Sequence, residues 1–101
     1  MLGRNRFAEV VDAQLELFAA EHRDVIEEVR DRLAAYNRAD RDEAEELYGD
    51  YLDSLEAGTG ILAAMRDAYA ATVADPEPYV RAFNRGVARR LAPFAAELEG
   101  R

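Results

Sequence analysis

The apolar residues of this chain recur in alternating steps of four and three over most of its length. In the middle of the chain the series runs through Ala44, Tyr48, Tyr51, Leu55, Gly58, Leu62, Met65, Tyr69 and Thr72. The preceding segment repeats it, with one extra step of four, through Val11, Leu15, Phe18, His22, Val25, Val29, Leu33 and Tyr36. This spacing gives each helix one apolar stripe and is typical of helices that pack lengthwise. The sequence therefore predicts a long helical hairpin.

Local end signals set the limits of the two hairpin helices. Asn5 is an acceptable N-cap for a first helix over about 5–37, which contains no glycine or proline. Asp40, followed three residues later by Glu43, resembles a capping box. This pair predicts a second helix over about 40–74.

A third helix follows the hairpin. Asp75 and Pro76 form a favourable start for a helix over about 76–98, which Pro93 is expected to kink or restart. Short connections between helices favour antiparallel neighbours. The expected fold is an all-α, antiparallel three-helix up-down-up bundle that forms a single domain over residues 1–101.

The predicted third helix is too short to cover the whole hairpin. At about 1.5 Å per residue, each hairpin helix is roughly 50 Å long, and the third is roughly two thirds of that length. The uncovered tip is predicted to expose apolar residues from both hairpin helices: Val25, Ile26, Val29, Leu33, Tyr36, Tyr48, Tyr51, Leu52 and Leu55. Because monomers rarely leave such a surface in water, we expect a homodimer that pairs tip to tip as four helices.

Three alternatives to this homodimer remain open at the sequence level. Another protein could cover the tip. The segment after Pro93 could fold back over it instead. The tyrosines could also lie half exposed with hydrated hydroxyl groups.

A second candidate site combines residues that break regular helix packing. Counting from the two turns brings His22, Gly58, Thr59 and Phe94 to one level, next to Gly60. A glycine inside a helix costs about 1 kcal/mol relative to alanine. One interpretation is structural: the glycines admit Phe94, and Thr59 satisfies a hydrogen bond of a core histidine. The other is a small polar pocket in which His22 acts as a base, a ligand or a pH sensor.

Charge and composition exclude several classes of function. The formal net charge of −8 argues against general binding of nucleic acids or anionic membranes, because both need a basic surface. The chain has no cysteine, which removes disulfides, thiolate metal sites and thiol catalysis. No apolar run approaches the roughly 20 residues of a membrane span, and no catalytic constellation is evident. We therefore expect an acidic cytoplasmic protein that acts by protein–protein interaction or self-assembly, without a cofactor.

One acidic stripe supports an alternative function. The segment 43–50 resembles the acidic helix of the all-α nucleotide pyrophosphohydrolases, which hold magnesium through paired motifs on adjacent helices. The resemblance implies a magnesium-dependent enzyme with carboxylates contributed across subunits, and its metal ligands would be Glu28, Asp31, Glu43 and Glu46. The next acids depart from the pattern and read Asp50-x-x-Asp53. The alternative interpretation is a solvated acidic helix face.

Overall fold

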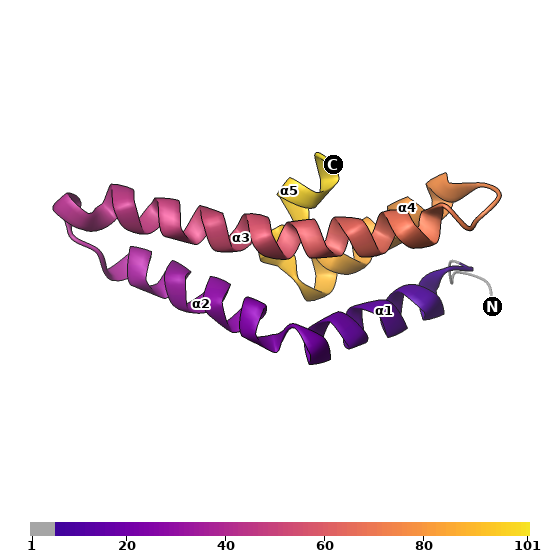
Figure 1. The fold of residues 1–101 in the computed structure, drawn as a ribbon, viewed down its shortest axis with the longest axis horizontal. Coiled ribbons are helices and arrows are strands. Elements are labelled where there is room, and N and C mark those ends of the chain that lie inside the picture. Colours follow the sequence, from indigo (N-terminus) through magenta and orange to yellow (C-terminus); the bar gives the residue numbers. More distant parts are fainter. Residues whose placement is uncertain (1–5) are drawn as a thin grey trace.

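The computed structural model describes residues 6–101, and this part of the chain is helical, without β-strands. The prediction of an all-α fold is confirmed for these residues, whereas the predicted N-cap Asn5 lies outside them. The elements, shown in Figure 1, are α1 (Ala8–Glu21), α2 (Arg23–Arg38), α3 (Arg41–Ala70), α4 (Pro76–Arg90), the 3₁₀ turn η1 (Ala92–Phe94) and α5 (Ala95–Glu99).

The first predicted helix is broken at His22, so the expectation of one unbroken helix over 5–37 is wrong. His22 has φ −124° and ψ 37°, outside the helical region. Its N–H still donates to the Phe18 carbonyl at 2.8 Å, and its own carbonyl accepts from the N–H groups of Val25 and Ile26 at 3.0 and 3.2 Å. The backbone therefore changes direction without losing these hydrogen bonds. As Figure 1 shows, α1 and α2 meet at an angle, and α1 packs against α4 while α2 packs against α3.

The turn between α2 and α3 follows from its sequence. Asp40 is the N-cap of α3, and its Oδ1 accepts a hydrogen bond from the Glu43 N–H at 3.2 Å. This is the capping contact that the spacing of these two residues predicts. Farther from the turn, Arg32 Nη1 donates to the Asp50 carbonyl at 2.8 Å and links the two helices. α2 and α3 therefore lie side by side over the whole of α2.

The second predicted helix ends earlier than expected, and the third is interrupted near Pro93, where a kink or restart is expected. α3 ends at Ala70 rather than near 74, where the Thr72 hydroxyl donates to the Tyr69 carbonyl at 2.7 Å and favours a turn over continued helix. α4 ends at Arg90, and η1, which contains Pro93, leads the chain into the short α5. The third predicted helix is thus two helices joined by a 3₁₀ turn.

One end of the molecule is thicker than the other. This end, here called the body, contains α1, the second half of α3, α4 and α5. Its core consists of Val11, Leu15, Phe18, Leu62, Tyr79, Phe83, Val87, Phe94 and Leu98. Gly86 brings α4 close to α1, since a Cβ there would lie 2.9 Å from Val11 Cγ1 and 3.0 Å from Leu15 Cδ1. Close packing of α4 against α1 therefore accompanies the bend between α1 and α2.

Two buried polar side chains, Tyr79 and Arg66, link different helices of the body. The Tyr79 hydroxyl donates to Gln14 Oε1 at 2.8 Å, and burial raises the pKa of Tyr79 to about 12. Arg66 is also buried, and its Nη1 donates to Asn84 Oδ1 at 3.1 Å and to the Leu98 carbonyl at 3.2 Å. Arg66 thereby ties α3 to both α4 and α5.

The other end, here called the arm, contains α2 and the first half of α3. It is two helices thick, whereas the body has α4 and α5 as a further layer (Figure 1). The molecule is accordingly elongated, with extents of 52 × 23 × 22 Å. In the arm, burial is confined to Val29 on α2 and to Ser54 and Leu55 on α3, so the expectation that Val29 and Leu55 are exposed at the tip is wrong.

Candidate functional site

The third layer of helices ends part-way along α3. Phe94 of η1 lies against Gly58, where an added Cβ would come within 2.9 Å of the Phe94 Cζ and 3.1 Å of the Val25 Cγ1. This confirms the predicted level of Phe94 and Gly58. After η1 the chain turns back toward the body, where the Leu98 carbonyl accepts from Arg66. α5 therefore covers the middle of α3 and not the tip of the arm.

Beyond Leu55, which is still buried, this side of α3 is uncovered. Leu52 lies seven residues, or about two turns, before the fully buried Thr59, so the two residues share a face of the helix. Leu52 is nevertheless 39% exposed, and Tyr48, one turn farther out, is 44% exposed. We call this uncovered side of the arm the open face.

Three tyrosines lie together near the tip. The ring centroids of Tyr36 and Tyr48 are 5.1 Å apart, and those of Tyr48 and Tyr51 are 6.1 Å apart. Tyr36 and Tyr51 are half-buried, whereas Tyr48 is exposed. Tyrosines of this kind present an apolar ring and a polar tip at a surface. The arrangement matches the half-exposed alternative and also leaves ring surface for a partner.

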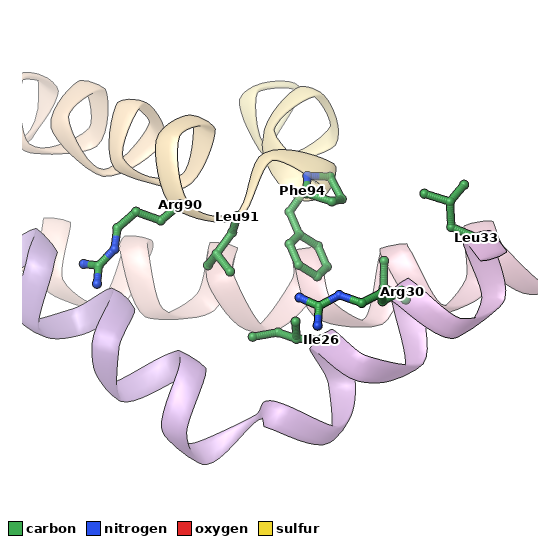
Figure 2. Close-up of a pocket in the computed structure, with 8 residues that line it drawn as sticks. Ile26, Arg30, Leu33, Arg90, Leu91 and Phe94 are labelled. Carbon is green, nitrogen blue, oxygen red and sulfur yellow. The ribbon is translucent and has the colours of Figure 1, made fainter.

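An apolar groove of about 250 Å³ adjoins the open face at the base of the arm (Figure 2). It is lined by Ile26, Val29, Arg30, Leu33, Arg90, Leu91, Pro93 and Phe94. Arg90 lies 3.8 and 3.7 Å from carboxylate oxygens of Asp12 and Glu16 and donates to the Asp12 carbonyl at 3.1 Å. Arg30, by contrast, has no hydrogen bond or ion pair within residues 6–101. The groove thus has an apolar floor and one positively charged side chain, Arg30, that makes no ion pair within residues 6–101.

Sequence reasoning found only part of this groove. Ile26, Val29 and Leu33 belong to the predicted apolar tip, but Arg30 does not. The spacing could have identified Arg30. It lies four residues after Ile26 and three before Leu33, and residues at these separations share a helix face. Arg90 contributes because α4 ends there, and the interruption expected at Pro93 does not by itself show that Arg90 lies beside α2.

At Gly58 the structure agrees with the interpretation of close packing rather than with that of a pocket. The Phe94 ring occupies the space that a side chain at Gly58 would need. Gly60 is different, because a Cβ there would make only an ordinary contact, 3.6 Å from Arg101 Nη1. The expectation that Gly60 admits a bulky neighbour is therefore wrong.

The contacts of Thr59 and His22 differ from those that the structural interpretation expects. Thr59 Oγ1 donates to the Leu55 carbonyl of its own helix at 2.8 Å, so the expected hydrogen bond from Thr59 to His22 is wrong. The His22 ring is half-buried and lies 5.3 Å from the ring of Phe18, which lies 6.2 Å from that of Phe94. The groove that Phe94 lines opens toward α2 and does not include His22.

The carboxylates expected to bind metal do not converge. Glu28, Asp31, Glu43 and Glu46 are all exposed, and Glu28 pairs with Arg32 one turn along α2. Within residues 6–101, no group of three or more histidine, aspartate or glutamate side chains could hold a metal ion. In the single chain these acids form a solvated face.

Comparisons of the chain with protein-family models, curated proteins and solved structures found no match. The resemblance to the all-α nucleotide pyrophosphohydrolases therefore rests on residues 43–50 alone. Among the described residues, no helix is both long enough and apolar enough to cross a membrane. The geometry of the open face and its groove is accordingly the basis for a functional proposal.

Proposed function

We propose that this protein acts by self-association, forming a homodimer in which two arms pack side by side as four helices. The observation that carries the proposal is the exposure of Tyr48 and Leu52 on a face of α3 that is covered in the body. In this proposal the chain is a three-helix up-down-up bundle in which α1 and α2 count as one interrupted helix. A second copy supplies the cover that α4 provides only in the body.

The distribution of charge supports a defined pairing of the two arms. Residues 41–56 of α3 contain seven acids and one arginine, whereas α2 contains four acids and four arginines. Two α3 helices placed face to face would repel each other, but α2 of one copy can face α3 of the other without net repulsion. A two-fold axis produces this pairing twice, as is usual in homodimers.

Solution mass tests the proposal directly. Light scattering of the full chain over a concentration series at physiological salt should give twice the chain mass of 11.3 kDa. Leu52→Glu places a charge on the open face and should give the monomer mass. Leu17 of α1 is 51% exposed, so Leu17→Glu is a matched control that should remain dimeric. A monomeric wild type, or dissociation by Leu17→Glu rather than by Leu52→Glu, would overturn the proposal.

The proposed dimer needs no cofactor, which separates it from the magnesium-dependent alternative. The support is the exposure of Glu28, Asp31, Glu43 and Glu46 together with the solvated face that they form. Millimolar magnesium should therefore leave the melting temperature unchanged. A rise in the wild type that Glu46→Gln abolishes would instead favour the enzyme. We also assign the dimer to the cytoplasm, where proteins rarely depend on disulfides, and a chain without cysteine is compatible with that compartment.

A further inference from the structure

We infer that the groove at the base of the arm receives the tip of the second copy, with Arg30 of one copy paired to Glu45 of the other. This inference rests on the proposed homodimer and defines its contacts. It assigns a role to a groove and to a charge that the fold of the single chain leaves unused.

The groove is suited to an apolar side chain bordered by a carboxylate. Its floor is aliphatic and aromatic, with Leu91 and Phe94 pointing from the η1 corner toward α2 (Figure 2). Arg30 lies on its α2 side and is exposed. In a chain of net charge −8, an arginine that has no ion pair within residues 6–101 and lies beside an apolar groove provides a local positive site for an acidic partner surface.

The first half of α3 carries the complementary pattern. Glu45, Tyr48 and Leu52 are separated by three and four residues, so they lie on one helix face, and all three are exposed. The Glu45 carboxylate has no hydrogen bond or ion pair within the described part of the chain. The stripe therefore presents a free acid next to two large apolar side chains, which matches the free arginine next to the apolar groove.

The position of the η1 corner agrees with this pairing. Arg30 lies about nine residues, and Glu45 about six, from the turn between α2 and α3. Antiparallel arms that bring these two side chains together overlap by about 15 residues, or roughly 22 Å. At that depth the tip of one copy reaches the level of Val25 in the other copy. Val25 and Phe94 of that copy both lie next to its Gly58. The η1 corner thus stops the incoming tip.

The same register brings apolar groups together. Tyr48 of one copy then lies at the level of Leu33 of the other, beside the groove. Because the axis is two-fold, each of these contacts occurs twice. The pairing buries Tyr48, the most exposed tyrosine of the tip, next to the Arg30–Glu45 pair.

Charge reversal provides the test. Arg30→Glu and Glu45→Arg should each raise the dimer dissociation constant by about tenfold or more, because each creates two like-charge contacts. An equimolar mixture of the two variants should restore wild-type affinity, because the mixed dimer has one native pair and one reversed pair. The double variant should also dimerise. Native mass spectrometry distinguishes the mixed dimer from either homodimer by mass.

Matched controls separate a specific pair from a general effect of charge. Arg85→Glu and Glu46→Arg make the same changes in net charge at exposed positions off the open face, and both should leave the dimer intact. Circular dichroism should show equal helix content in all variants.

The possible failures are distinguishable. A monomeric wild type overturns the proposed function and this inference together. A wild-type dimer that both reversals leave intact keeps the proposed function and overturns the groove pairing. Loss of the dimer in both single variants without recovery in the mixture also overturns it, because the two side chains then do not face each other.

Discussion

The body and the arm share one apolar rhythm along α3 but bury it to different extents. In the body, Thr59 and Leu62 are fully buried, whereas in the arm Tyr48 and Leu52 are exposed. The backbone is an uninterrupted α-helix across both regions. The difference lies in the third layer, which reaches as far as Phe94. Periodicity thus predicts which residues share a helix face, and the neighbouring elements determine whether that face is covered.

This contrast assigns different tasks to the two regions. The body contains the largest fully buried side chains, so its packing sets the stability of the single chain. The arm keeps part of its apolar surface in contact with water, so changes there should alter association more than stability. Three experiments test this division.

Truncation of Phe94 should have the largest effect. Phe94→Ala removes a fully buried ring and opens a cavity beside Gly58, and we expect a loss of about 3–5 kcal/mol in the free energy of unfolding. Tyr48→Ala in the arm should cost about 1 kcal/mol or less when measured in the monomeric Leu52→Glu background. Urea denaturation followed by circular dichroism measures both. Equal losses would contradict the division between body and arm.

Alkaline pH should weaken the body through Tyr79. Its pKa is raised to about 12 in the folded chain against 10.0 for an ordinary tyrosine, so the unfolded chain ionises first. The stabilisation is fully present below pH 10 and is lost as the pH rises toward 12, with a total of roughly 2–3 kcal/mol. Urea midpoints measured across this range should fall for the wild type. The decline should be smaller in Tyr79→Phe and unchanged in the arm variant Tyr36→Phe.

Two glycines of α3 should respond with opposite signs, and this effect is the smallest. Gly58→Ala in the body should destabilise by about 1–3 kcal/mol, because its Cβ meets the Phe94 ring. Gly49→Ala in the arm should stabilise by about 0.5–1 kcal/mol, because nothing lies within 4 Å of its Cβ and alanine favours the helix. Thermal unfolding of the two variants beside the wild type gives the comparison. Stabilisation by Gly58→Ala would show that Phe94 moves aside freely.

The sequence predicts features that depend on neighbouring residues or on the number of residues between a turn and a given position. The cap formed by Asp40 and Glu43 is local, and the level at which Phe94 meets Gly58 follows from the constant rise of a helix. The break at His22 could not be predicted, because it needs neither glycine nor proline. It accompanies the divergence of α1 toward α4, where Gly86 permits close approach.

The groove and the buried polar contacts depend on residues that are distant in the sequence. Arg66 is not part of the predicted apolar series, yet it is buried because Asn84 and the Leu98 carbonyl accept its hydrogen bonds. The groove combines α2 with the end of α4, and Pro93 predicts an interruption there without predicting that α2 lies beside it. Single-sequence patterns do not contain such relationships.

The contacts of Arg66 also make the packing of the body depend on α5. A buried guanidinium in the middle of α3 needs the Leu98 carbonyl as an acceptor. Loss of α5 would remove this acceptor, whereas the hydrogen bond from Arg32 to the Asp50 carbonyl in the arm would stay intact. Damage to α5 is therefore transmitted to the middle of the longest helix, and the arm is spared.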